Sequence, residues 1–76
     1  MVAAIQIKDH MSVVDSTGTE IATVDHMDGV DSIKLTKDES GRHHWIPIAW
    51  VSRVDTYVHL DRSGDDTIRD WSETAI

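Results

Sequence analysis

The sequence predicts a mainly β fold: a small, strongly bent β-barrel with a one-turn helical corner near residues 47–51 and a short C-terminal helix. Two observations predict this class. Apolar and polar residues alternate in short runs, which is the period of a half-buried strand. Clusters of Asp, Ser and Gly separate the runs at intervals of about ten residues, as in β-sandwiches and barrels. The chain has 76 residues, so we expect one domain over 1–76, with the barrel at about 7–62 and the helix at about 64–75.

The alternation is clearest at residues 32–37 and 57–61, where every second residue is apolar. The segment 20–28 alternates less regularly, as expected for a strand that bends. An earlier strand contains Val13 or Val14, but two adjacent valines leave its register open. The residues expected to face the core from the two clearest strands are Ile33, Leu35, Val58 and Leu60.

Three clusters of turn residues divide these strands. "DSTG" at 15–18 and "DESG" at 38–41 combine an Asp with a Gly three residues later, and "DG" occupies 28–29. Asp accepts hydrogen bonds from nearby backbone N–H groups, and Gly adopts the left-handed conformation that tight turns require. Apolar runs separated by such clusters predict β-hairpins.

The stretch "HHWIPIAWV" (43–51) contains two of the three tryptophans and the only proline. Pro47 has no N–H group, so it cannot lie within a central strand. We therefore expect the incoming strand to end near Ile46 and a single helical or 3₁₀ turn to follow the proline. Extended structure should resume at Arg53. The residues expected to close this end of the barrel are Ile46, Ile48, Val51 and Val54.

The segment "SGDDTIRDWSETAI" has a helical pattern. Ser63 followed by Asp66 resembles a capping box, and Ile68, Trp71 and Ala75 fall on one face of a helix. A helix this short is unstable alone in water. We expect its apolar face to dock either on its own barrel or on another copy of the chain.

The charge balance excludes several functions. Seven Lys and Arg stand against 14 Asp and Glu, a formal net charge of −7. The cations are scattered singly, so we expect no nucleic-acid binding. With no cysteine, thiol chemistry and disulfides are excluded. The N-terminal apolar run is too short for a signal peptide or membrane helix, which predicts a cytoplasmic protein without membrane contact.

No motif indicates catalysis or a bound cofactor, and we expect a protein that is not an enzyme. Phosphate-loop, nucleophile-elbow and EF-hand patterns are missing. His43 and His44 resemble a metal pair, but adjacent strand residues point to opposite faces, so no metal site is assigned. A metal- or small-ligand-binding protein stays open as an alternative. Its ligands would come from His26, His43, His44 and His59.

The tryptophans are the stronger functional indication, because aromatic residues are enriched at binding hot spots. Trp45 lies opposite to Ile46 in the strand alternation, which predicts a surface position if Ile46 faces the core. Whether the tryptophans complete the core or form an interface is left open. The candidate protein-interface residues are Trp45, Trp50, Ile68 and Trp71.

The order of the segments resembles a family of short bacterial proteins of unknown function related to the PRC-barrel domains. "DHMSVVDSTGTEIATVDHMDG" looks like the family's opening strand, turn and second strand. "DSIKLTKDESGRHHWIPIAWVSRVDTYVHLDRS" looks like its second half, with the aromatic-Ile-Pro corner, the Trp-Val pair and the Val-x-Leu strand. The resemblance runs from about Ile7 to Ser63. It departs at Ala22, where the family often has Gly, and in the 16–18 turn.

The resemblance implies a bent barrel of five or six strands and no catalytic residues. PRC-barrel relatives are docking modules, in the photosynthetic reaction-centre H subunit and in a ribosome maturation factor that holds a ribosomal protein. Together with the small barrel, the tryptophan-rich corner and the amphipathic C-terminal segment, this leads us to expect a non-catalytic protein-binding or assembly module. Its partner is an unidentified protein or a second copy of the chain, which would make it a homo-oligomer. A ribosome-assembly adaptor is the further alternative that this analogy implies.

Overall fold

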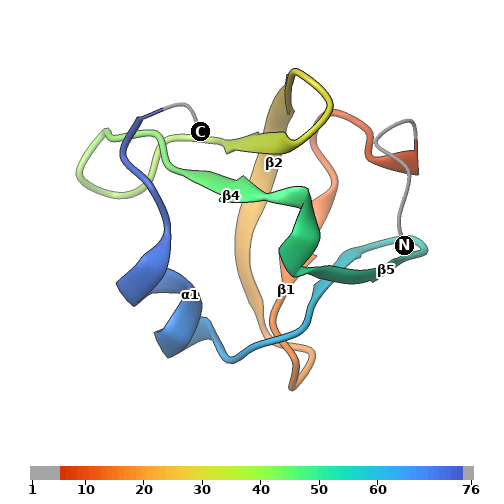
Figure 1. The fold of residues 1–76 in the computed structure, drawn as a ribbon. Helices are drawn as coiled ribbons and strands as arrows, with labels where there is room; N and C mark the ends of the chain where they lie inside the picture. Colours follow the sequence, from red (N-terminus) through yellow and green to blue (C-terminus); the bar gives the residue numbers. More distant parts are fainter. Residues whose placement is uncertain (1–5, 75–76) are drawn as a thin grey trace.

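The computed structural model describes residues 6–74 and contains a six-stranded sheet, a short helix and a 3₁₀ turn between two of the strands (Figure 1). The 3₁₀ turn η2 spans Ile48–Trp50, and the helix α1 spans Gly64–Asp70. The mainly β class, the helical corner and the C-terminal helix are thus confirmed. The strands are β1 (Ser12–Val14), β2 (Glu20–Asp28), β3 (Ser32–Leu35), β4 (Trp45–Pro47), β5 (Val51–Val54) and β6 (Val58–Leu60).

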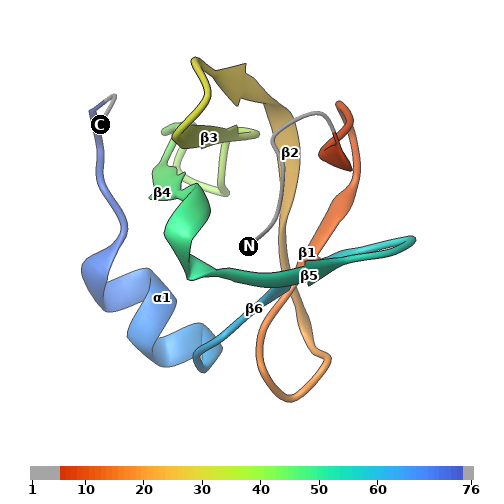
Figure 2. The ribbon, with the colours of Figure 1, turned by 45° about the vertical axis from the view of Figure 1, so that its right-hand side comes forward.

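The sheet is strongly bent, but it is not closed into a barrel. Its strand order is β4-β3-β2-β1-β6-β5, and all neighbours are antiparallel except β1 and β6. The two edge strands, β4 and β5, are consecutive in the chain and joined only by η2 (Figure 2). Pro47 ends β4 without a backbone donor, and η2 then turns the chain, so the ladder stops on both sides of this corner.

The core confirms the alternation read from the sequence. Ile33, Leu35, Val58 and Leu60 are each at most 2% exposed, and Ile46 is fully buried beside them. The strand ladder thus places the predicted inward face of β3, β4 and β6 on one continuous core.

The adjacent valines of β1 are both buried, and the register between β1 and β2 shifts between them. Val13 belongs to the main core cluster, whereas Val14 is buried outside that cluster. The sequence pattern could not choose between the two valines, since the strand uses both.

The "DSTG" turn is organised by the carboxylate of Asp15. Its Oδ1 atom accepts hydrogen bonds from the N–H groups of Thr17 (2.9 Å) and Thr19 (3.0 Å) and from the Thr17 hydroxyl (2.7 Å). Its Oδ2 atom accepts from the N–H of Gly64 (3.0 Å), which ties the start of α1 to the first hairpin. The Thr17 hydroxyl and the three N–H groups stabilise the ionised carboxylate and lower the pKa of Asp15 to about 2.

The "DESG" turn repeats this chemistry. Asp38 Oδ1 accepts from the N–H groups of Ser40 (2.8 Å) and Arg42 (3.1 Å) and from the Ser40 hydroxyl (2.6 Å). The Ser40 hydroxyl and these backbone donors lower the pKa of Asp38. Gly18 and Gly41 close the two turns with φ of 89° and 84°, the left-handed conformation that favours glycine.

The helix is shorter than predicted. The Ser63 hydroxyl accepts from the N–H of Asp66 (3.1 Å), so the predicted N-cap is confirmed. The helix ends at Asp70 instead of about residue 75, because Trp71 is extended (φ −65°, ψ 156°) and Ser72 pairs with Trp45 of β4. Ala75, the last member of the predicted apolar face, lies outside the described residues. In the described part of the chain, no helix has the length and apolar content that crossing a bilayer requires.

Candidate functional site

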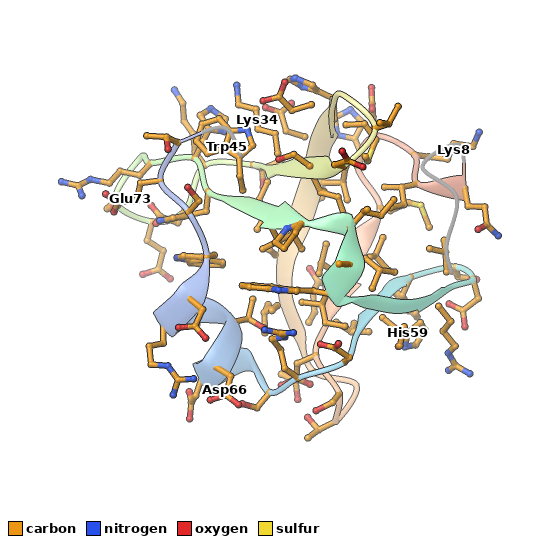
Figure 3. All side chains as sticks on the ribbon, in the orientation of Figure 1. Lys8, Lys34, Trp45, His59, Asp66 and Glu73 are labelled. Atoms are coloured by element: carbon orange, nitrogen blue, oxygen red, sulfur yellow. The ribbon has the colours of Figure 1, made fainter. Side chains whose placement is uncertain are left out.

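The outer face of strands β2, β3 and β4 gathers aromatic and charged side chains around Trp45. Cross-strand register places Lys34 beside Trp45 on one side and beside His26 on the other. Figure 3 shows Trp45 and Lys34 projecting together from this part of the sheet. We call this surface the Trp45 face. Its residues are Asp25, His26, Asp28, Lys34, His43 and Trp45.

The Trp45 ring is held in place from two sides. Its indole Nε1–H donates to Asp28 Oδ2 at 3.0 Å, and the Lys34 ammonium lies 5.6 Å from the ring centroid. The second distance is within the range of a cation–π contact. The ring is half-buried, as strand alternation predicted, because Ile46 faces the core. The polar edge of the indole is thus satisfied inside the protein, while part of its apolar surface remains open to solvent.

The two histidines of this face make separate contacts. His43 Nδ1 lies 2.8 Å from the carbonyl oxygen of Leu35 and therefore carries a hydrogen. Asp25 lies between the rings, with its carboxylate oxygens 3.4 Å from His26 Nδ1 and 3.7 Å from His43 Nδ1. Among residues 6–74, no group of three or more His, Asp or Glu side chains is arranged to hold a metal ion.

One border of the Trp45 face is hollowed. Arg42 and Glu73 form an ion pair of 3.3 Å, and together with His43 and Trp45 they line a depression of about 290 Å³. The depression brings an aromatic ring, a cation and a carboxylate within one contact area. Two of these residue types, tryptophan and arginine, are enriched at protein–protein interfaces.

The structure does not bring the four predicted interface residues together. Trp50 is half-buried, with the Arg62 guanidinium 4.0 Å from its ring centroid. Trp71 packs against the core and stacks on the buried ring of His44 at 4.2 Å. Ile68 lies on α1 and is 52% exposed. Ile68 and Trp71 were expected on one docking face, but the helix ends between them, and only Trp71 is packed inward.

Three residues of the Trp45 face, Asp25, Asp28 and Lys34, were not among the candidates predicted from the sequence. Asp28 was interpreted as a turn residue and Lys34 as a solvated strand residue, whereas both contact the Trp45 ring. The alternation of β3 indicated only that Lys34 points outward. Placing Lys34 beside Trp45 would also have required the register between β3 and β4. Nothing in the local sequence marks Asp28, since its partner lies 17 residues away.

The comparisons with known proteins bear on family membership. No curated protein and no solved structure matches the chain. One family model does match, over residues 7–67, which include all six strands and the first part of α1. The matched region contains the whole Trp45 face but excludes the segment after Thr67. The chain therefore belongs to the family described as uncharacterized protein conserved in bacteria (DUF2171).

Proposed function

We propose that this protein is a non-catalytic protein-binding module whose contact surface is the Trp45 face. The observation that supports the proposal is the arrangement of Trp45, whose ring is fixed by Asp28 and Lys34 while part of it stays accessible. An aromatic side chain that is already ordered loses little conformational entropy when a partner covers it. Tryptophan is one of the three residue types that are most enriched at binding hot spots.

The partner that fits best is a positively charged protein. The chain has a formal net charge of −7, and a field of this sign accelerates encounter with a basic partner. Two copies of the chain repel each other through the same field, so self-association is the weaker option. On this surface, Asp28 and the neighbouring Glu73 supply carboxylates near the Trp45 ring, and Asp25 supplies one beside His43.

We further infer a relation between this family and the PRC-barrel domains. Support comes from the strongly bent six-stranded sheet and the one-turn corner after Pro47, although the sheet is open. The relation suggests a docking role in the cytoplasm, with a basic ribosomal protein as one partner of suitable charge. This part of the proposal rests on analogy between folds.

The test is a comparative pull-down from the native organism, read by quantitative mass spectrometry. Tagged wild-type chain is compared with Trp45→Ala and with Tyr57→Ala. Tyr57 is a matched control because it is a large, exposed aromatic residue, 45% exposed, in the turn between β5 and β6. We expect a basic protein that is recovered with wild type and Tyr57→Ala and reduced at least tenfold with Trp45→Ala.

Two results would contradict the proposal. The first is a set of bound proteins that is identical for the two variants. The second is a dimer of the purified chain, detected by size-exclusion chromatography with light scattering, that is lost in Trp45→Ala. The dimer would assign the Trp45 face to a second copy instead of a basic partner.

A further inference from the structure

The segment that follows α1 lies against the edge of the sheet in the manner of a bound peptide. We call residues 71–73 the C-terminal strap. Ser72 pairs with Trp45 of β4 through two backbone hydrogen bonds, Trp45 N–H to Ser72 O (2.8 Å) and Ser72 N–H to Trp45 O (2.9 Å). Trp71 supplies an aromatic anchor and Glu73 a charged one. This combination of strand pairing and side-chain anchors is how sheet edges recognise extended peptides.

The aromatic anchor occupies a pocket built around His44. The His44 ring is buried, and Trp71 stacks on it with centroids 4.2 Å apart and planes inclined by 16°. A cavity of about 100 Å³ remains beside Trp71, lined on its apolar side by Ile21, Ala22 and Leu35. Trp71 therefore does not fill the available space, and a different occupant can pack there as well. We call the site the His44 pocket.

The charged anchor lies at the entrance to this pocket. Glu73 is paired with Arg42 at 3.3 Å and lies 4.0 Å from His44 Nε2. On the other side of the imidazole, Asp38 Oδ2 lies 3.4 Å from Nδ1. Glu73, two residues after Trp71, therefore contacts both the Arg42 guanidinium and the edge of the His44 ring.

The strap forms hydrogen bonds with only some of the backbone groups at the outer edge of β4. Alternate residues of an antiparallel strand direct their backbone groups to opposite sides, so Pro47 is the next residue after Trp45 that faces the strap, and it has no N–H. In the other direction the strap turns away, because the Ser72 hydroxyl donates to the Thr74 carbonyl (2.6 Å) and accepts from its N–H (3.1 Å). The pairing consequently stops after one bridge, and the edge toward His43 stays available.

The element that carries the strap is weakly attached. The helix α1 has seven residues and one buried side chain, Thr67. Arg69 forms ion pairs only with Asp66 and Asp70 of the same helix, among the described residues. A helix of this length has little stability of its own. Its position depends on the Gly64–Asp15 hydrogen bond at its start and on the strap at its end. In Figures 1 and 2, α1 and the strap lie beside β4 at one end of the molecule.

The region matched by the family model contains the sheet residues of the pocket but not the strap that occupies it. Every sheet residue of the His44 pocket lies within the matched region 7–67, whereas the strap lies outside it. We propose that the His44 pocket and the adjoining β4 edge form a peptide-binding site, which the strap occupies in this chain. The partner is an extended peptide with an aromatic residue followed, two positions later, by a carboxylate. This site adjoins the Trp45 face, with which it shares the backbone of Trp45 and the Arg42–Glu73 pair, but the proposal does not rest on the function proposed for that face.

The test uses a labelled peptide with the sequence of residues 67–74 (TIRDWSET) and the full-length chain. In the Trp71→Ala variant the pocket is open, whereas in wild type the tethered strap competes at the high effective concentration of an intramolecular ligand. By fluorescence anisotropy, we expect the peptide to bind Trp71→Ala at least tenfold more tightly than wild type. We also expect at least a tenfold loss for the peptide with Ala in place of its Trp.

Controls protect the test against misfolding. Circular dichroism establishes whether Trp71→Ala is folded, and Ser72→Pro provides a second variant. Proline at this position removes the N–H bond to Trp45 while keeping the Trp71 ring. A folded Trp71→Ala chain that does not bind the peptide overturns the proposal, as does equal binding by wild type and Trp71→Ala. If Trp71→Ala does not fold, Ser72→Pro takes its place, and peptide binding no tighter than that of wild type overturns the proposal. A wild-type dimer that exchanges its straps also overturns it, since the pocket would then serve a second copy.

Discussion

Ser32 carries the one buried side-chain oxygen without a hydrogen-bond partner in the described part of the chain. It is the first residue of β3, is 1% exposed, and lies opposite Pro47 of β4. No donor or acceptor among residues 6–74 forms a hydrogen bond with the Ser32 hydroxyl, so its polarity is buried without compensation. Replacing Ser32 with Ala should therefore stabilise the protein, which is the opposite of the usual effect of a buried substitution.

The size of the effect follows from two opposing contributions. Burying a hydroxyl without a partner costs about 1–3 kcal/mol. Removing the oxygen leaves a void smaller than a methyl group, which costs at most about 1 kcal/mol. The expected net gain in the free energy of unfolding is thus about 1 kcal/mol. For a domain of this size, that raises the melting temperature by about 4–8 °C.

Thr67 provides the matched control, because it is a fully buried hydroxyl that does have a partner. Its Oγ1–H donates to the carbonyl oxygen of Ser63 at 2.9 Å. Thr67→Val keeps the shape of the side chain and removes this bond, while the Thr67 N–H continues to occupy the Ser63 carbonyl at 3.0 Å. The free energy of unfolding of this variant should be lower than that of wild type by about 0.5–1.5 kcal/mol.

Urea denaturation of both variants, followed by tryptophan fluorescence and circular dichroism, measures the two free energies. Opposite signs for Ser32→Ala and Thr67→Val are the expected result. A destabilised Ser32→Ala would refute the reasoning, because it would mean that the Ser32 hydroxyl is bonded, for example to an enclosed water molecule.

Two further predictions concern acid stability and the core. The pKa of Asp15 is lowered to about 2, so its ionised form stabilises the fold above a pH of about 4, and this stability is lost as the pH falls toward 2. The pKa of Asp38 is also lowered, so its contribution is likewise lost on acidification. Asp15→Asn should lower the melting temperature at pH 7 and make the melting temperature decline less steeply below pH 5. Both effects should be larger than for Asp38→Asn, because only Asp15 also accepts a hydrogen bond from Gly64. Equal pH profiles for both variants and wild type would argue against this. Ile33→Ala, at a fully buried position, should cost about 2–5 kcal/mol in urea denaturation, and Ile68→Ala, at an exposed position, less than about 0.5 kcal/mol. Similar losses of unfolding free energy at the two positions would show that Ile68 of α1 is packed against the rest of the protein.

The strands and turns were predictable because their signals are local. Alternation at residues 32–37 depends only on the pleat of one strand, and it identified Ile33 and Leu35 as core residues. The Asp-x-x-Gly turns likewise depend on a carboxylate and on backbone groups two to four residues away. Pro47 ended its strand because of its own covalent structure.

The errors came from contacts between distant parts of the chain. The helix was predicted to reach residue 75, but pairing of Ser72 with Trp45 competes with the last helical turn. Helical periodicity placed Ile68 and Trp71 on one face, which holds only while the helix continues. The partners of Trp45, namely Asp28 and Lys34, required the cross-strand register, which no single segment contains.

The central claim is that Trp45 anchors a basic protein partner. The most direct measurement is isothermal titration calorimetry of that partner, purified after the pull-down, against wild type, Trp45→Ala and Tyr57→Ala at low and high salt. We expect at least a tenfold weaker affinity for Trp45→Ala, an unchanged affinity for Tyr57→Ala, and weaker binding of wild type at high salt. Equal affinities for wild type and Trp45→Ala would contradict it.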